Sequence, residues 1–226
     1  MTELILALDT PRGADALRLL DQLPVLHWVK VGSILMTREG PDFIRQLTAR
    51  GLEVFLDLKW HDIPNTVAGA VTAARELGVS MATVHTLGGS TMLEAAAVAA
   101  GGELALVGVT VLTSHDSQNY GRAVGRTEVD LGHEVERQAL VALAAGLQGI
   151  VCSPQEVSLL RGRLGPEPLI VVPGIRRRSD PASDQARVAT AKDAVMNGAT
   201  HLVVGRPILQ AADPALAFEE FLEEAR

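Results

Sequence analysis

The sequence predicts an α/β protein folded as one (β/α)8 TIM barrel. Eight short apolar segments rich in β-branched residues alternate with Ala- and Leu-rich segments of helical periodicity. The strand-like segments are apolar on both faces, which is typical of parallel strands that are covered on both sides. No linker or change in composition divides the 226 residues. Since a closed α/β barrel routinely uses a chain of this length, we expect residues 1–226 to form a single domain.

The elements follow one another in regular alternation. The predicted strands are residues 4–8, 27–31, 53–58, 81–85, 105–112, 149–152, 169–172 and 201–204. The predicted helices are residues 13–22, 41–50, 66–77, 90–100, 132–145, 155–163, 186–197 and 214–224. Glycines that follow directly on helical segments are expected to end them in the left-handed conformation: Gly51, Gly78, Gly101, Gly146, Gly165 and Gly198.

A doubly wound open sheet is the alternative fold, because it shows the same alternation of strands and helices. It commonly carries a glycine-rich G-x-G-x-x-G turn after its first strand or a G-x-x-x-x-G-K-[ST] loop. Neither pattern occurs at those places in this chain. The barrel is therefore favoured.

Composition narrows the class of protein. Hydrophobic residues make up 47% of the chain and aromatic residues only 3%, so Ala, Val, Leu and Ile must build the core. No apolar run approaches the roughly 18 residues of a membrane span, and no signal peptide is recognisable. The single Cys152 fits a reducing compartment, and the net charge of −7 argues against nucleic-acid binding. We expect a cytoplasmic protein with no nucleic-acid or membrane partner.

The lysines are unusually few. The chain has 17 Arg but only three Lys, namely Lys30, Lys59 and Lys192. Lys can lose its proton in a desolvated site, whereas Arg cannot. In a barrel, chemistry takes place at the carboxyl ends of the strands. The polar residues expected there are Asp9, Lys30, Asp57, Lys59, Asp62, His85, Thr86, Thr113, Ser114, Ser153, Arg176 and Arg206.

Three charged residues are expected to meet at this end of the barrel. Asp57 and Lys59 are two positions apart, so a regular strand turns both side chains to the same face. Lys30 ends the neighbouring strand. Cations and anions that alternate in a partly dry pocket keep one another charged. They form either an active site or an ion-pair network that merely closes the barrel end.

The segment D-L-K-W-H-D-I-P-N-T, residues 57–66, resembles the catalytic signature of the orotidine 5′-phosphate decarboxylase family. The D-x-K-x-x-D core alone is shared by sugar-phosphate decarboxylases and aldolase-like synthases of the same barrel group. Further segments match that family in order and spacing over essentially the whole chain: Leu8-Asp9, Lys30-Val31-Gly32, Val111-Leu112-Thr113-Ser114, Val151-Cys152-Ser153, Pro173-Gly174-Ile175-Arg176 and Val204-Gly205-Arg206-Pro207-Ile208.

The resemblance implies decarboxylation of orotidine 5′-phosphate to UMP in pyrimidine biosynthesis, without a cofactor or metal. Lys59 would stabilise the carbanion at C6 and then protonate it. Asp57 would lie near the substrate carboxylate. Lys30 would keep Asp57 ionised and contact the ribose, and Asp9 would accept a ribose hydroxyl.

The same resemblance implies a homodimer and a set of binding residues. Asp62 and Thr66 would reach the site of the other subunit, with Ile63 of the same segment also against the substrate. Thr113, in preference to Ser114, would bond the pyrimidine. The phosphate would be held by Gly205 and Arg206, and by Arg176 and Gln185 of the loop after the seventh strand.

Other suggestive residues are expected to have structural roles. We expect His115, Asp116, His133 and Glu134 to be solvated, Cys152 to be a buried hydrophobe and His61 to be a loop residue. His85 lines the mouth and is a weak candidate for a bond to the Lys59 network.

Two alternatives to the decarboxylase remain. A Mg²⁺-dependent 3-keto sugar-phosphate decarboxylase or synthase of the same group would need an acidic ligand where this chain has Lys30. A non-catalytic sugar-phosphate-binding barrel is the second.

Overall fold

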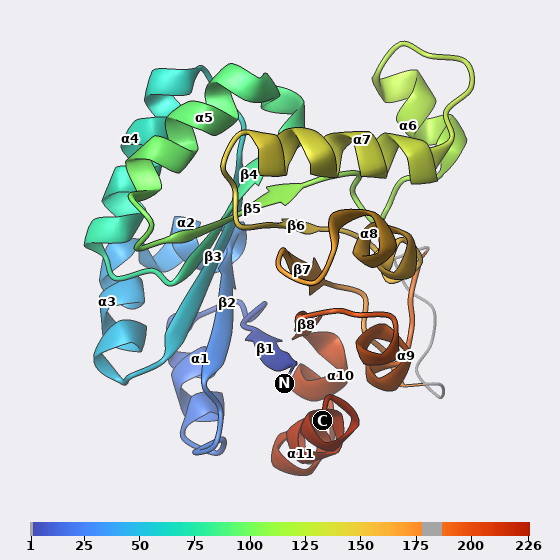
Figure 1. The fold of residues 1–226 in the computed structure, drawn as a ribbon. Coiled ribbons are helices and arrows are strands. Elements are labelled where there is room, and N and C mark those ends of the chain that lie inside the picture. Colours follow the sequence, from blue (N-terminus) through green and yellow to red (C-terminus); the bar gives the residue numbers. More distant parts are fainter. Residues whose placement is uncertain (1, 178–186) are drawn as a thin grey trace.

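The computed structural model describes residues 2–177 and 187–226. Eight parallel strands form a closed barrel in which each strand pairs with the next along the chain and β8 pairs with β1 (Figure 1). The barrel prediction is confirmed, and the open doubly wound sheet is excluded. The strands are β1 (Glu3–Ala7), β2 (Trp28–Gly32), β3 (Glu53–Trp60), β4 (Met81–His85), β5 (Ala105–Val109), β6 (Gly149–Val151), β7 (Leu169–Val172) and β8 (His201–Val204).

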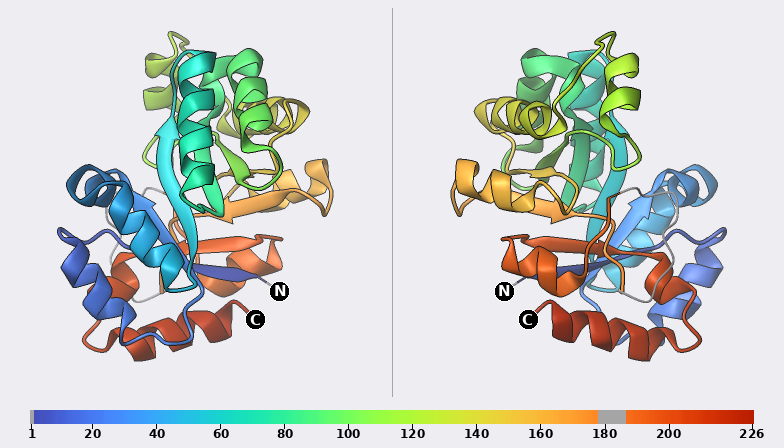
Figure 2. Two further views of the ribbon diagram at one scale, coloured as in Figure 1. Left: turned by 90° about the vertical axis from the view of Figure 1, so that its left-hand side faces the viewer. Right: turned by 90° about the vertical axis from the view of Figure 1, so that its right-hand side faces the viewer.

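Helices surround the ring of strands (Figure 2). Those that were expected are α1 (Gly13–Leu20), α3 (Pro41–Ala49), α4 (Pro64–Glu76), α5 (Gly89–Ala100), α7 (Leu131–Ala144), α8 (Val157–Leu164), α9 (Ala191–Met196) and α11 (Pro214–Glu224). Those that were not expected are α2 (Ser33–Glu39), α6 (Ser117–Ala123), α10 (Arg206–Leu209) and the 3-10 turn η1 (Thr86–Gly88). Each of the unexpected helices follows a strand end, so they belong to the loops that carry the site.

The six glycines expected to end helices all have positive φ, from 64° at Gly101 to 102° at Gly198. The left-handed conformation costs glycine little, which is why these positions end the helices cleanly. Two strands end more than one residue away from the expected position. β3 continues to Trp60, two residues beyond the expected end, and β5 stops at Val109, three residues short.

The core has two layers because successive side chains of a strand point to opposite sides. On β1, Leu4 and Leu6 pack outwards against the helices, whereas Ile5 and Ala7 fill the barrel. The interior cluster is Ile5, Ala7, Phe55, Met81, Val107, Val171 and Val203. This filling makes the barrel a packed core and leaves open space only at its rim.

Within the described ranges, no helix has both the length and the apolar character that crossing a membrane requires.

Candidate active site

A cavity opens at the carboxyl ends of the strands, where the fold places chemistry. Its lining includes side chains that follow or end every strand except β4: Ala7, Asp9, Lys30, Phe55, Asp57, Lys59, Val109, Val111, Leu112, Thr113, Val151, Cys152, Val171, Pro173, Gly174, Ile175, Arg176, Val203, Gly205 and Arg206. Charged groups lie on the β1–β3 side and on the β7–β8 side. Aliphatic groups after β5 and β6 form the wall between them.

The charged groups of β1, β2 and β3 form a row of alternating sign. Lys30 Nζ lies 3.2 Å from Asp9 Oδ1 and 3.5 Å from Asp57 Oδ2. Lys59 Nζ lies 2.8 Å from Asp57 Oδ1. The side chains of Lys30 and Asp57 are 11% and 13% exposed, whereas that of Lys59 is 38% exposed. The row therefore runs from a desolvated centre to a lysine that faces the cavity.

Asp57 is held ionised at the centre of the row. Burial by itself raises the pKa of this carboxyl, but the charges of Lys30 and Lys59 oppose burial. Hydrogen bonds from Lys59 and Thr83 act in the same direction, and the net result is a pKa below the ordinary value. Two cations thus share one anion, which leaves the Lys59 ammonium able to interact with a further negative group.

A local irregularity of β3 brings Lys59 to this place. Leu56 pairs with Ala82 and Trp60 pairs with Val84, so four steps along β3 match two steps along β4. Lys59 lies inside this bulge with φ of 52°, and it is the one non-glycine residue with positive φ in the described ranges. A left-handed lysine costs about 1–3 kcal/mol, and such strain is commonly found at functional sites.

Two glycines leave room around Asp9 and Lys30. A Cβ atom on Gly32 would lie 3.2 Å from Lys30 Nζ and 3.6 Å from Asp9 Oδ1. A Cβ atom on Gly205 would lie 3.3 Å from the Ala7 Cβ and 3.6 Å from Asp9 Oδ2. A side chain at either position would crowd the charged row.

The β7–β8 side offers cationic groups to an anion. Arg176 follows β7, and Gly205 and Arg206 follow β8, and all three line the cavity. Gln185 lies outside the described residues. Helix α10 begins at Arg206 and is only four residues long. The guanidinium of Arg206 is the group at this end of β8 that could bind an anion in bidentate fashion.

Asp62, Ile63 and Thr66 are placed differently from the rest of the expected site. All three are exposed at the start of α4 and are not among the residues that line the cavity. Asp62 Oδ1 accepts a hydrogen bond of 2.6 Å from the backbone N–H of Ile63. Ile63 is 67% exposed, which is a large apolar surface for a residue beside a charged site.

The loop after β5 distinguishes the two candidates for the pyrimidine contact. Thr113 lines the cavity, whereas Ser114 is exposed and does not. Cys152 is also in the lining but only 1% exposed, and burial raises the pKa of its thiol well above the ordinary value. The expectation that Cys152 is buried is confirmed.

A buried ion pair behind this wall escaped the sequence analysis. Arg187 and Glu156 are both buried and form a salt bridge. Arg187 also donates to the carbonyl oxygen of Leu112 at 3.2 Å, and Glu156 accepts from the backbone N–H of Ser153 at 2.9 Å. The pair thus ties the loops after β5 and β6 together. Its signal in the sequence was weak, since Arg187 is one of 17 arginines.

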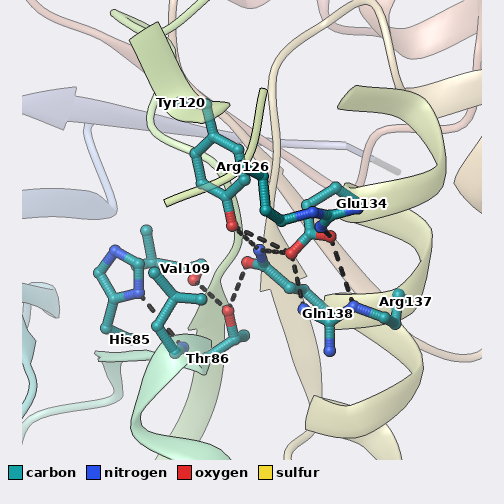
Figure 3. A network of polar contacts seen from close by, with 9 residues as sticks. His85, Thr86, Val109, Tyr120, Arg126, Glu134, Arg137 and Gln138 are labelled. Carbon is teal, nitrogen blue, oxygen red and sulfur yellow. Dashed lines mark hydrogen bonds and ion pairs between the residues drawn. The ribbon is translucent and has the colours of Figure 1, made fainter. Parts of the chain in front are cut away.

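A second buried network connects β4 and β5 with α6 and α7 (Figure 3). Thr86 Oγ1 lies 2.8 Å from the Val109 carbonyl oxygen and 2.7 Å from Gln138 Oε1. Gln138 Nε2 donates to Tyr120 and Glu134, and Tyr120 donates to Glu134 at 3.0 Å. Glu134 is 5% exposed, so the expectation that it is solvated is wrong. The helical pattern around Glu134 did not reveal that Tyr120 and Arg126, from α6 and the segment after it, contact its carboxylate.

The histidines near the site have structural contacts. His85 accepts a long 3.5 Å bond from the backbone N–H of Leu87, and its ring stacks on His61 with centroids 5.5 Å apart. Burial, together with the charges of His61 and Lys59, lowers the pKa of His85 to about 4. His85 is therefore neutral near pH 7. His115 packs against Tyr120, and Asp116 caps α6 by accepting from the Asn119 N–H.

Comparison with known proteins shows the family of the chain. The model of the Orotidine 5′-phosphate decarboxylase / HUMPS family matches residues 2–221. The chain is 51% identical to the orotidine 5′-phosphate decarboxylase of Halorhodospira halophila, over 95% of this chain and 92% of that protein. It is 47% identical to that of Dichelobacter nodosus, over 97% and 96% of the two chains. The crystal structure of the Lactobacillus acidophilus orotidine 5′-phosphate decarboxylase superimposes with a TM-score of 0.89 at 36% identity, over the full length of both chains.

Proposed function

The chain belongs to the orotidine 5′-phosphate decarboxylase / HUMPS family, and on that premise we propose that it decarboxylates orotidine 5′-phosphate to UMP. The observation that carries the proposal is the row Asp9–Lys30–Asp57–Lys59 at the cavity floor. We further propose that residues 1–226 form one catalytic domain, that it needs no cofactor or metal and that it acts in the cytoplasm.

Lys59 is proposed to supply both the cation and the proton. When the bond between C6 and the carboxylate breaks, the electron pair remains on C6, and the pyrimidine has no cofactor to delocalise it. An ammonium group at that carbon stabilises the developing charge and then donates a proton to form the C6–H bond. Because the Lys59 side chain is 38% exposed in the open cavity, the neutral amine can regain a proton from water.

Asp57 and Lys30 are proposed to prepare Lys59. The pKa of Asp57 is lowered, so its carboxylate is charged when the substrate binds and holds the ammonium in place. The substrate carboxylate would then lie close to a fixed negative charge, which favours its loss as CO2. Lys30 keeps Asp57 ionised and, with Asp9, faces the ribose hydroxyls.

The phosphate is proposed to bind on the β7–β8 side. Arg206 and Arg176 offer guanidinium groups there, and Gly205 allows close backbone approach. We include Gln185 in this grip. Binding energy from the phosphate can drive closure of the site and exclude water, which strengthens each charge interaction inside. Thr113 is proposed to bond the pyrimidine.

The second subunit is proposed to complete the site. Asp62, Ile63 and Thr66 are exposed and lie outside their own chain's cavity, which is what residues that act on a partner require. In a twofold dimer, the segment of each chain would enter the cavity of the other. Asp62 would add a second carboxylate beside Lys59.

A Mg²⁺-dependent sugar-phosphate enzyme is the competing function. Asp9 and Asp57 could supply oxygen ligands, but the Lys30 ammonium lies between them, within 3.5 Å of each. A bound divalent cation would be repelled from that position. The ammonium therefore occupies the place that such a metal would need.

The test is the ultraviolet absorbance change when purified protein meets orotidine 5′-phosphate, with and without EDTA. We expect conversion that EDTA does not alter and that Lys59→Ala abolishes. An inert wild-type protein would overturn the assignment, and turnover of a 3-keto sugar phosphate that requires Mg²⁺ would replace it.

A further inference from the structure

Thr83 of β4 lies directly beneath the catalytic pair. It is fully buried. Its hydroxyl oxygen accepts a hydrogen bond of 2.8 Å from the backbone N–H of Lys59 and donates one of 3.1 Å to Asp57 Oδ1. Asp57 Oδ1 is the same atom that meets Lys59 Nζ at 2.8 Å.

These contacts form a closed ring. The backbone N–H of Lys59 donates to the Thr83 hydroxyl, and this hydroxyl donates to the Asp57 carboxylate. The Lys59 ammonium donates to the same carboxylate, which closes the ring. The polarity is fixed, since an N–H can only donate and an ionised carboxylate can only accept. A hydroxyl, which does both, suits the position between them. A purely apolar side chain of the same shape does not.

The hydrogen bond from Lys59 to Thr83 takes the place of a backbone hydrogen bond between β3 and β4 that the bulge removes. In a regular sheet, a β3 N–H would donate to a β4 carbonyl oxygen, but the register shift between Leu56 and Trp60 breaks that ladder. The Thr83 side chain takes over as acceptor at Lys59, the residue with φ of 52°. Without the Thr83 hydroxyl, the Lys59 N–H would lose this hydrogen bond, and that loss would add to the cost of the left-handed conformation.

We propose that Thr83 is a positioning residue for decarboxylation. Its single hydroxyl fixes the positions of the Lys59 ammonium and the Asp57 carboxylate relative to each other. The expected effect of Thr83 on kcat rests on the proposed function. The positioning of Lys59 and Asp57 by Thr83 does not, because the ring of hydrogen bonds is present whatever substrate the cavity binds.

The first test compares Thr83→Val, which keeps the shape and removes the hydroxyl, with Thr83→Ser, which keeps the hydroxyl. We expect Thr83→Val to lower kcat on orotidine 5′-phosphate by about 10²-fold, as misplacement of a catalytic group by about 1 Å does. KM and the affinity for UMP should stay within about threefold of wild type, because the ribose and phosphate contacts remain. Thr83→Ser should recover most of kcat.

The matched control is Thr200→Val, at the opposite end of the barrel. The Thr200 hydroxyl accepts from the Ile170 N–H at 2.9 Å, so this variant also removes a side-chain acceptor from a strand N–H. We expect it to lower the melting temperature without changing kcat. Equal loss of kcat in Thr200→Val and Thr83→Val would overturn the proposal. So would a Thr83→Ser variant as slow as Thr83→Val.

A crystal structure of Thr83→Val separates failure of this inference from failure of the function. We expect Lys59 to leave the positive-φ region, or its Nζ to move away from Asp57 Oδ1. Unchanged geometry would overturn the positioning role, even in a protein that acts on another substrate. If Thr83→Val does not fold, Thr83→Cys replaces it in both measurements, since a thiol is a weaker donor and acceptor at the same place.

Discussion

Lys59 Nζ lies 2.8 Å from Asp57 Oδ1, although Lys59 sits in a backbone conformation that few lysines adopt. The carboxylate is shared with Lys30, so its charge is divided between two ammonium groups. The Lys59 ammonium is therefore only partly neutralised by Asp57 and can interact with a further negative group. The bulge of β3 thus lies at the charged pair itself, and Lys59 reaches the Asp57 carboxylate from this irregular part of the strand.

Replacement of Lys59 should abolish turnover whichever side chain takes its place. Lys59→Ala and Lys59→Arg should each lower kcat by at least about 10⁴-fold, because the first removes the cation and the second keeps a cation that cannot give up its proton. The measurement is decarboxylation rate, with UMP binding as the check that the site still forms. Substantial turnover by Lys59→Arg would show that charge alone suffices.

Arg206→Ala should separate binding energy from chemistry. We expect a much larger loss of kcat/KM on orotidine 5′-phosphate than on orotidine, which has no phosphate for Arg206 to bind. The two substrates are compared under identical conditions in wild type and variant. Losses of equal size on both would place Arg206 outside the phosphate grip.

Mixing two inactive variants tests the shared site. Lys59→Ala and Asp62→Ala are each expected to be inactive alone. If Asp62 acts on its partner, a mixed dimer has one site with both lesions and one with neither, so random mixing restores about a quarter of the sites. Activity is measured after the variants are dissociated and reassociated together. No recovery in verified mixed dimers would place Asp62 in its own chain's site.

Glu134→Gln should destabilise the fold. The hydrogen bond from Arg137 is the largest of the effects that lower the pKa of Glu134 to about 2, against the opposing effect of burial. We expect a loss of about 2 kcal/mol at pH 7, since bonds to a charged group are stronger than neutral ones. Urea unfolding is the measurement, and the exposed Glu128→Gln should change stability by less than about 0.5 kcal/mol.

The pH dependence of this loss has a definite sign. The folded pKa of Glu134 is below its ordinary value, so its stabilising contribution is complete above about pH 4.5. It disappears as the pH falls towards 2. The difference between wild type and Glu134→Gln should therefore shrink through that range. A constant difference would mean that the charge of Glu134 contributes nothing.

His201 should make the fold weaker in mild acid. It packs edge-on against Trp28 at 5.5 Å, and burial lowers its pKa to about 4. Because the unfolded chain binds the proton first, the contribution is present above about pH 6.5 and falls between 6.5 and 4. Between pH 7 and pH 5, wild type should lose more unfolding free energy than His201→Asn. Equal losses of unfolding free energy in the two proteins would show that His201 does not cause the weakening in acid.

The sequence was informative wherever local rules decide structure. The strands were found because runs buried on both sides are apolar, and six helix ends were found because glycine tolerates positive φ. Helix α2 was missed, since it follows β2 directly from Gly32 and has no side-chain cap at its start. Helix α6 was missed in a polar segment, although Asp116 caps it.

The sequence predicted that Asp57 and Lys59 lie together at the cavity, but it did not predict how β3 holds them there. Alternation along a regular strand places Asp57 and Lys59 on one face, but β3 is not regular there, and no local pattern specifies φ of 52° at Lys59. Thr83 acts through contacts with another strand, and Tyr120 reaches Glu134 from α6, a helix that was not expected. Such contacts depend on the final packing, which a reading of one segment at a time does not contain.

The pairing of β1 with β8, which closes the barrel, also governs when the active site can form during synthesis of the chain. Asp9 leaves the ribosome with the first strand, whereas Gly205 and Arg206 emerge only after the last one, and the two ends meet where β1 pairs with β8. A nascent chain that stops before β8 leaves one edge of β1 without its neighbour and lacks Gly205 and Arg206, the groups proposed to bind the phosphate. We therefore expect incomplete translation products to lack activity, and catalysis to begin only when β8 has closed the barrel.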